Sequence, residues 1–286
     1  MFARMMEITT KVGCSLHCRY CPQDRLVSAY YGEKNRCLHY KTPSLMSFEV
    51  FRTCIDKIPV NTDIHFSGMC EPWLNPNCTK MLIYAHERGH KVHIFTSLVG
   101  MSNEDYNLIK HIPFETFVLH IPDEEGNSGF CITDSYLQLF DRIMNDVKSG
   151  CFRIDGFSCH GAVHPAIFDL VMNSKIRVNS QMNTRAGNVS PDCGLDPVKP
   201  LVGDIMCRWC GGTSLDRNVL LPNGLVLMCC MDYGMEYPLG NLLEESYLEI
   251  SDGHLKTTYR DMMTSEQKGK ILCRYCSRAI HTSIKP

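Results

Sequence analysis

The chain has 286 residues, of which 29 are Lys or Arg and 31 are Asp or Glu, so its formal net charge is −2. Hydrophobic residues make up 44% of it, which is enough for a substantial core and argues against a disordered chain. The near-neutral charge argues against binding to nucleic acid or to an anionic membrane surface. No apolar run approaches the roughly 20 residues that span a bilayer. Because the first residues also lack the apolar segment of a secretory signal, we expect a cytoplasmic protein.

Short apolar runs alternate with helical patterns up to about residue 189. Six runs predict buried strands, at residues 6–10, 63–67, 91–96, 116–120, 153–158 and 175–179. Helical patterns lie between them, at residues 47–57, 77–87 and 134–148. Such alternation is typical of a parallel sheet with right-handed crossovers, whose ligands bind at the carboxyl ends of the strands. We therefore predict an α/β domain over residues 1–189, with an open sheet or a partial barrel.

The composition changes after residue 189. Residues 190–206 are rich in turn-forming residues and predict a linker. Beyond them, two short apolar runs at 218–221 and 225–228 flank a Pro-Asn-Gly turn and predict a β-hairpin. Helices are expected at 243–250 and 255–265. We predict a second, smaller domain over residues 207–286.

Seventeen cysteines are far more than packing requires. A reducing cytoplasm makes a disulfide framework improbable, and an odd number fits full pairing badly. Ligation of a metal or of an iron–sulfur cluster is the best remaining explanation.

The first cysteine group directly follows the first predicted strand. Three residues separate Cys14 from Cys18, and two separate Cys18 from Cys21. A short loop with these spacings can hold three irons of a cubane and leave the fourth iron free to chelate a small ligand. Zinc prefers four ligands and commonly uses paired two-residue spacings, so this group favours an iron–sulfur cluster.

The second group lies in the C-terminal part. It comprises Cys207 and Cys210, the adjacent Cys229 and Cys230 after the hairpin, and the closing pair Cys273 and Cys276. Four thiolates from three segments suit either a fully ligated cubane or structural zinc, and chemistry alone does not choose between them.

The first cysteine loop, with the aromatic Tyr20 before its last Cys, resembles the cluster loop of the radical S-adenosylmethionine (SAM) superfamily. The resemblance implies a partial (β/α)6 barrel, a 4Fe–4S cluster that binds SAM, and reductive cleavage of SAM to a 5′-deoxyadenosyl radical. The segment from Gly68 to Glu71 occupies the place where relatives hold the methionine amino group, although Met69 and Cys70 depart from the common Gly-Gly-Glu pattern. Thr96 and Ser97 match a strand end that approaches SAM in relatives, and ordinary strand-end hydrogen bonding is an equal alternative.

The C-terminal part resembles the SPASM/twitch extension, which binds auxiliary 4Fe–4S clusters in many members of the superfamily. Thirteen residues separate Cys210 from Gly224, and four separate Gly224 from Cys229. The resemblance implies a small β-hairpin plus helix domain of the shorter twitch form, with one auxiliary cluster. The ligands it implies are Cys210, Cys229, Cys273 and Cys276. Cys207 is a rival for Cys210, and Cys230 for Cys229.

The chain is also similar in outline to twitch-bearing radical SAM dehydrogenases. That similarity implies oxidation of a secondary alcohol of a small polyol, sugar or aminocyclitol to a ketone, with Arg185 beside the substrate oxygen. An Arg185 that pairs with the SAM carboxylate or with a surface acid is an equal alternative. His120 and Asp123 follow the fourth strand on the ligand side and are candidates for contact with ribose or substrate, or for a structural role.

Other reactions remain open at this stage. A Cys close to the substrate would make the protein a radical epimerase, with Cys159, Cys193, Cys207 or Cys230 as the hydrogen donor. Modification of a peptide is a further alternative, and a non-catalytic iron–sulfur or zinc protein is another. The expected partners are a small-molecule substrate and a flavodoxin- or ferredoxin-type electron donor, with no nucleic acid and no membrane.

Overall fold

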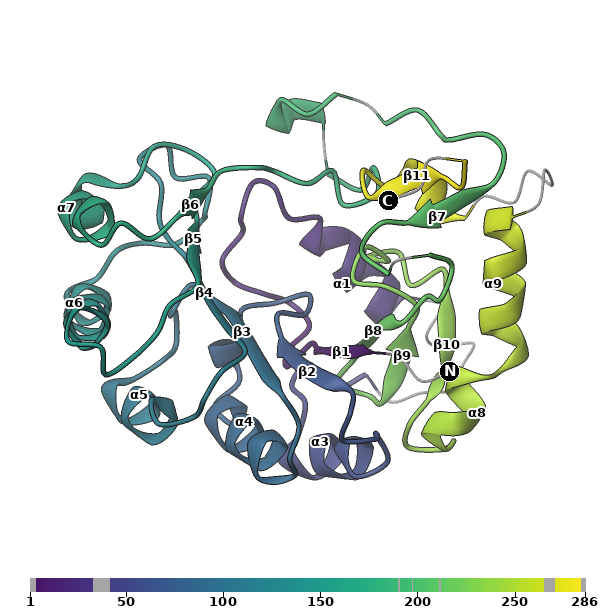
Figure 1. Cartoon of the computed structure of the whole chain (residues 1–286), viewed down its shortest axis with the longest axis horizontal. Helices are drawn as coiled ribbons and strands as arrows, with labels where there is room; N and C mark the ends of the chain where they lie inside the picture. The colour runs from purple at the N-terminus through teal and green to yellow at the C-terminus, as the bar shows by residue number, and fades with distance from the viewer. Residues whose placement is uncertain are drawn as a thin grey trace.

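The computed structural model describes residues 4–32, 42–189, 191–196, 198–210, 212–264 and 271–283. A curved sheet forms its core, with helices along the outer face (Figure 1). Within the described part of the chain, no helix combines the length and apolar character needed to cross a membrane.

Six parallel strands form the N-terminal part of the sheet, in the order of the chain. All six predicted strands are present, and the prediction of a parallel α/β core is confirmed. Their bounds are β1 Met5–Ile8, β2 Asp63–Phe66, β3 Val92–Thr96, β4 Thr116–His120, β5 Gly156–Ser158 and β6 Val178–Asn179.

Helices connect the strands and cover the outer face of the sheet (Figure 1). Three match the predictions, at α3 Phe48–Ile55, α4 Cys78–Glu87 and α6 Asp134–Lys148. The side chain of Ser47 caps α3, accepting a hydrogen bond from the backbone N–H of Val50. Three further helices were not predicted from the sequence, namely α1 Gln23–Tyr31, α5 Asn103–Ile109 and α7 Pro165–Asn173.

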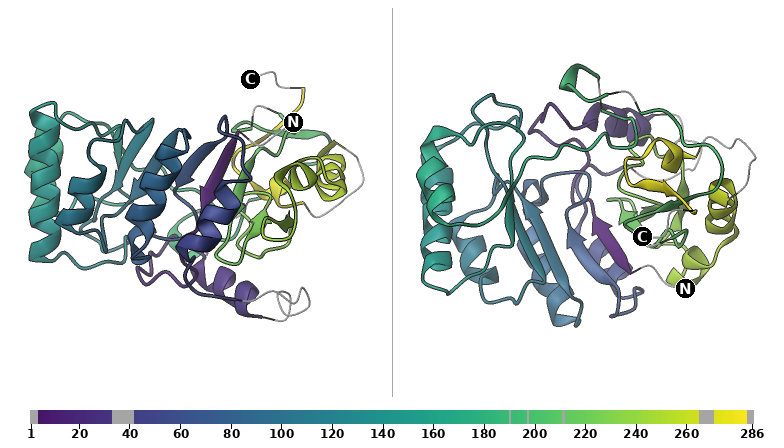
Figure 2. Two further views of the ribbon diagram at one scale, coloured as in Figure 1. Left: turned by 90° about the horizontal axis from the view of Figure 1, so that it is seen from below. Right: turned by 45° about the horizontal axis from the view of Figure 1, so that its top comes forward.

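The C-terminal part extends the same sheet. The predicted hairpin is present as β8 Arg217–Leu220 and β9 Leu225–Leu227, and β10 Pro238–Asn241 pairs with β9. Strand β8 pairs in parallel with β1, so the nine strands run β10-β9-β8-β1-β2-β3-β4-β5-β6. Figure 2 shows the C-terminal elements packed beside the β1 end of the barrel. The hairpin therefore fixes the position of the C-terminal part relative to the core.

Smaller elements complete the C-terminal part. Strands β7 Ile205–Cys207 and β11 Ala279–His281 form a separate antiparallel pair. The helices are α8 Tyr247–Ser251 and α9 His254–Thr264, and residue 265 of the second predicted helix lies outside the described residues. The predicted start of the first helix at residue 243 is wrong. Ser246 and Glu249 form a capping box that begins the helix at Tyr247.

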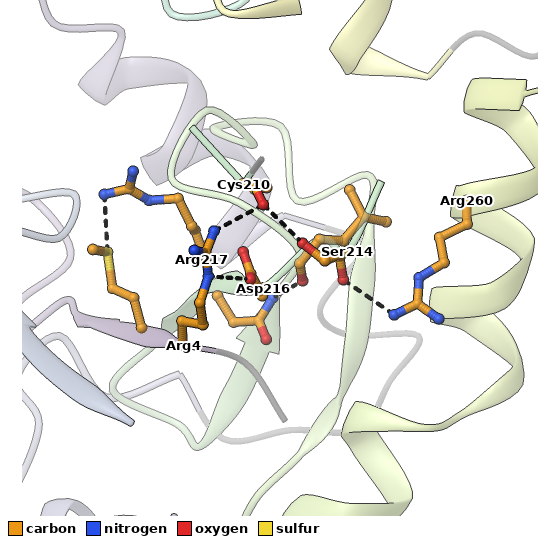
Figure 3. A network of polar contacts seen from close by, with 9 residues as sticks. Arg4, Cys210, Ser214, Asp216, Arg217 and Arg260 are labelled. Carbon is orange, nitrogen blue, oxygen red and sulfur yellow. Dashed lines mark hydrogen bonds and ion pairs between the residues drawn. The ribbon is translucent and has the colours of Figure 1, made fainter. Parts of the chain in front are cut away.

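A polar network joins the start of the chain to the loop that precedes β8 (Figure 3). Arg4 Nε pairs with the buried carboxylate of Asp216 at 2.6 Å, and Arg4 Nη2 donates to the carbonyl of Cys210 at 2.8 Å. On the other side, Arg260 Nη2 on α9 donates to the carbonyl of Ser214 at 3.1 Å. The loop that carries Cys210 is thus held both by the N-terminal strand and by the last long helix.

Candidate active site

The first cysteine loop lies at the carboxyl end of β1, as predicted. The side chains of Cys14, Cys18 and Cys21 line one cavity together with Cys70 and Glu71. In the orientation that satisfies its neighbours, the amide of Gln23 accepts hydrogen bonds from the backbone N–H groups of Gly13 and Cys14 and donates to the carbonyl of Met69. These bonds tie the loop to the end of β2.

A second loop, after β4, packs against the cysteine loop. The thiol of Cys18 donates to the carbonyl of Ser128 at 2.9 Å, and the backbone N–H of Arg19 donates to the carbonyl of Asn127. Asp123 shapes this loop, because its buried carboxylate accepts from the N–H groups of Asn127 and Ser128 at 2.7 and 2.8 Å. Asp123 therefore organises backbone, which is the structural alternative left open by the sequence.

The distances between thiols bear on the kind of metal site. In a tetrahedral zinc site, sulfur ligands about 2.3 Å from the metal lie about 3.8 Å from one another. Among the described residues, no three cysteine thiols all lie within 4.8 Å of one another. A cubane holds its thiolates farther apart than a single metal ion does. The donor sets at both cysteine groups consist of thiols, which are the ligands that iron–sulfur clusters use in proteins.

Three of the residues expected near SAM form one buried group. The carboxylate of Glu71 accepts from Thr96 Oγ1 at 2.6 Å, and from the backbone N–H and hydroxyl of Ser97 at 2.7 and 2.8 Å. Burial raises the pKa of Glu71 to about 7 against the opposing effect of these hydrogen bonds. The structure thus brings Glu71, Thr96 and Ser97 together at the carboxyl ends of β2 and β3.

Gly68 is required by its contact with the neighbouring strand. A Cβ atom at this position would lie 2.5 Å from the carbonyl oxygen of Ile8 and 2.6 Å from Thr9 Oγ1. Met69, at the position that departs from the common pattern, donates its backbone N–H to Thr9 Oγ1 at 3.1 Å. The thiol of Cys70 accepts from the N–H of Lys11 at 3.4 Å. The two unusual residues are therefore accommodated without a second glycine.

A larger pocket, of about 500 Å³, opens beside the cysteine cavity. The two share six lining residues, namely Tyr20, Ser67, Phe95, His120, His160 and Arg185. The ring of Tyr20 packs edge-on against His160, with centroids 4.3 Å apart. Burial and the charges of His160 and Arg185 lower the pKa of His120 to about 4. His120 and Arg185, both predicted site residues, thus stand between the two spaces.

Arg185 occupies an unusual backbone position. Arg185, Ala186 and Gly187 all have positive φ, at 49°, 55° and 78°. For the two residues with side chains, such a conformation costs about 1–3 kcal/mol each and persists only where the surroundings enforce it. Asn183 Oδ1 accepts from the N–H of Arg185 at 2.8 Å, and Asn188 Nδ2 donates to its carbonyl at 2.7 Å. These bonds hold the backbone of Arg185 in this conformation, at a position where the residue lines both cavities.

Several pocket residues were not predicted from the sequence. Glu7 lies on β1, aligned with His65 of β2, and both line the pocket. A charged residue inside an apolar strand just before the cysteines was the available signal for Glu7. The others are Trp209, Arg217 and Arg278, which come from the C-terminal part. No local pattern marks these three, because contacts between distant parts of the chain bring them to the pocket, as the β1–β8 pairing does for Arg217.

Cysteines from two segments of the C-terminal part meet at the β7–β11 pair. Cys207 ends β7 opposite Ala279, and this pairing brings it next to the turn that carries Cys273 and Cys276. Burial is the largest cause that raises the pKa of Cys276, to about 11, and the charges of the neighbouring thiols Cys207 and Cys230 also raise it.

The choice between rival ligands stays a prediction. A hydrogen bond from Cys210 lowers the pKa of Cys207 to about 6. The charge of Cys207 also raises the pKa of Cys273 and that of Cys276. For Cys210, the hydrogen bond with Cys207 and burial raise the pKa most. Cys230 lines the substrate-sized pocket, and its partner Cys229 does not.

Comparisons with known proteins agree with this architecture. Residues 207–277 match the SPASM family, an iron–sulfur cluster-binding domain. No curated protein sequence matches the chain. Among solved structures, BtrN in complex with AdoMet and 2-DOIA is 17% identical, with a TM-score of 0.57 over 100% of this chain and 96% of that one.

Two further solved structures share the fold. SuiB of Streptococcus suis bound to precursor peptide SuiA is 13% identical, with a TM-score of 0.53 over 91% of this chain and 67% of that one. Native anSMEcpe with bound AdoMet is 14% identical, with a TM-score of 0.50 over 96% of this chain and 86% of that one. The chain thus has the radical SAM fold followed by a SPASM-family iron–sulfur domain, and the resemblance predicted from the sequence is confirmed at this level.

Proposed function

We propose that the protein is a radical SAM enzyme that removes a hydrogen atom from a small polyol, sugar or aminocyclitol and oxidises a secondary alcohol to a ketone. The observation that carries this proposal is the shared wall between the two cavities. The cysteine cavity adjoins a pocket of substrate size, and Arg185 and His120 line both. When bound, the two clusters would supply the 5′-deoxyadenosyl radical from SAM and a one-electron acceptor.

In this proposal, Cys14, Cys18 and Cys21 hold the first cluster, and Tyr20, Gly68, Glu71, Thr96, Ser97 and His120 surround SAM. Cys273, Cys276 and two thiols from the other segments hold the auxiliary cluster. A flavodoxin- or ferredoxin-type protein would supply the electron.

Arg185 and Glu7 would act on the substrate hydroxyl. A fixed guanidinium favours an anionic oxygen beside it, so Arg185 would bind the hydroxyl whose carbon loses hydrogen. Glu7 is the pocket carboxylate near Arg185 and would accept the hydroxyl proton. Oxidation of the alcohol would release one hydrogen atom, one proton and one electron. Glu7 would take the proton, and bound SAM and the auxiliary cluster would supply the acceptors for the hydrogen atom and the electron.

Anaerobic reconstitution tests the proposal directly. We expect about eight iron atoms per chain, as two cubanes require, and 5′-deoxyadenosine when reductant and SAM are added. Cys18→Ala should lose about half of the iron and all 5′-deoxyadenosine, whereas Cys151→Ala, an exposed cysteine outside both groups, should change neither. Four irons with one zinc would contradict the auxiliary cluster. Absence of 5′-deoxyadenosine from the fully loaded protein would contradict the enzyme assignment.

Epimerisation is the second candidate, and Cys230 is the observation that favours it. This thiol is buried in the wall of the pocket, close to Glu7. A thiol at this position is placed to return a hydrogen atom to a substrate radical. An epimerase of this kind would incorporate solvent deuterium at carbon and lose product formation in Cys230→Ala while still making 5′-deoxyadenosine. A dehydrogenase would give a carbonyl product without deuterium.

A further inference from the structure

The larger pocket has a positive charge balance. Four arginines line it, namely Arg177, Arg185, Arg217 and Arg278, against the carboxylates of Glu7 and Asp155. The Asp155 carboxylate already accepts from the backbone N–H of Phe117 at 2.7 Å and lies 3.3 Å from Arg153 Nη2. Glu7 is the other pocket carboxylate; burial raises its pKa, and the charges of Arg217 and Arg185 lower it. An amine-bearing substrate would meet unfavourable charge in this space.

Two of these arginines are held side by side on one indole. The guanidinium carbon of Arg217 lies 4.9 Å from the ring of Trp209, and that of Arg278 lies 4.4 Å from it. Cation–π contacts of this kind fix the plane of a guanidinium while its N–H edge stays available. Trp209 therefore presents two cations to the same part of the pocket.

Within the described part of the chain, neither arginine forms an ion pair with an acidic side chain, although the charge of Arg217 lowers the pKa of Glu7. Arg217 Nη2 contacts only the sulfur of Met5, at 3.2 Å, and the Nε atoms of Arg217 and Arg278 are buried without a hydrogen-bond partner. Two adjacent cations with unsatisfied buried donors are costly unless an anion binds between them. Part of this charge lies near the auxiliary thiols, since the charge of Arg217 lowers the pKa of Cys207 and the charge of Arg278 lowers that of Cys276. Arg177, just before β6, carries positive charge to another wall of the pocket.

We propose that the substrate carries an anionic group, a phosphate or a carboxylate, that Arg217 and Arg278 bind while Arg185 holds the reacting hydroxyl. This inference rests on the proposed function and narrows it. Among small polyols and sugars, it selects phosphorylated or acidic ones over amino sugars and aminocyclitols. Guanidinium groups bind phosphate and carboxylate oxygens through paired N–H donors, which suits either anion.

Anaerobic calorimetry on the cluster-loaded protein with SAM tests this proposal. The probes are inorganic phosphate, glucose 6-phosphate, glucuronate, glucose and glucosamine. We expect phosphate to bind, and at least one charged sugar to bind at least tenfold more tightly than glucose and glucosamine. Preference for glucose 6-phosphate identifies a phosphate site, and preference for glucuronate identifies a carboxylate site. Arg217→Met and Arg278→Met should each weaken anion binding at least tenfold.

The controls separate this inference from the function on which it rests. Arg208→Met removes an exposed arginine next to Trp209 that does not line the pocket, and should bind the anion like the wild type. Arg217→Lys and Arg278→Lys, which keep the charge, should bind with intermediate affinity, and iron content reports whether each variant is assembled. The inference would be overturned if none of the anions bound, or if glucosamine bound as tightly as the charged sugars or more tightly. It would also be overturned if anion binding were unchanged in both Arg217→Met and Arg278→Met. Formation of 5′-deoxyadenosine without substrate, measured on the same preparations, tests the radical SAM function independently.

Discussion

His65 is a buried titratable residue that the structure keeps neutral. Its ring stacks on His93 of the next strand, with centroids 3.8 Å apart, and it is 5% exposed. Burial lowers the pKa of His65 to about 2, with further lowering from the charges of His93 and Arg217. Asp63 on its own strand and Glu7 on β1 are the acids that face it, and Asp63 Oδ2 lies 3.4 Å from His93 Nε2.

This environment predicts a loss of stability in mild acid. An unfolded chain takes up a proton on His65 below its ordinary pKa of about 6.5, whereas the folded chain does not. Stability is therefore present above pH 6.5 and falls by up to about 1.4 kcal/mol per pH unit below it. Between pH 7.5 and 5, we expect the wild type to lose about 2 kcal/mol more than His65→Gln. Urea unfolding at the two pH values measures the difference.

Two comparisons make that measurement specific. His111→Gln makes the same substitution at an exposed imidazole and serves as the matched control for the change of residue type. Burial raises the pKa of Glu7, which works in the opposite direction, but Glu7 is present in all three proteins. If the free energy of unfolding fell equally between the two pH values in the wild type and in His65→Gln, His65 would have to bind a proton in the folded state.

At the scale of elements, the loop after β4 packs against the first cysteine loop and supports its conformation. Gly129 has a φ of 71°, and a Cβ atom there would lie 1.9 Å from the carbonyl oxygen of Leu16 and 2.8 Å from the nitrogen of Cys18. Both neighbours are backbone atoms, so relief requires movement of the cysteine loop itself.

Gly129→Ala should therefore impair assembly of the first cluster. We expect iron to fall from about eight to about four per chain, as one of two cubanes is lost, together with loss of SAM cleavage. Gly126→Ala is a matched control, because Gly126 has nearly the same φ of 72° and a Cβ atom there would have no neighbour within 4 Å. It bears the conformational cost of about 1 kcal/mol without the clash. Full iron content in Gly129→Ala would show that the first cysteine loop does not depend on its contact with the loop after β4.

Local patterns explain which elements the sequence predicted. The β1–β6 strands and the loop that holds Cys14, Cys18 and Cys21 depend on nearby residues, and their positions were predictable. The capping box of Ser246 and Glu249 is also a local signal, and it places the start of the helix four residues after the predicted one. Arg217 and Trp209 had no such signal. Their place in the pocket depends on β8 pairing with β1 across more than two hundred residues of sequence, which spacing and periodicity do not encode.

At the scale of the whole molecule, the two parts of the chain share one sheet. The sequence predicted a core over residues 1–189 and a separate domain over 207–286, joined by a linker at 190–206, and this division stays a prediction. Strand β1 lies between β2 and β8, so it pairs with a strand from each part. Removal of the C-terminal part would expose the edge of β1, and edge strands in that state pair with other chains.

The shared sheet predicts that both parts unfold together. The chain has two tryptophans, Trp73 buried in the core at 4% exposure and Trp209 in the C-terminal part. Each single-tryptophan variant, Trp73→Phe or Trp209→Phe, reports on one part by fluorescence during urea unfolding. With strand pairing and the Arg4–Asp216 ion pair crossing between the parts, we expect one transition with coincident midpoints after correction for each variant's own stability. Two separated transitions, with Trp209 changing first and iron retained at the first cluster, would instead show that the C-terminal part is an independent folding unit docked onto a self-sufficient barrel.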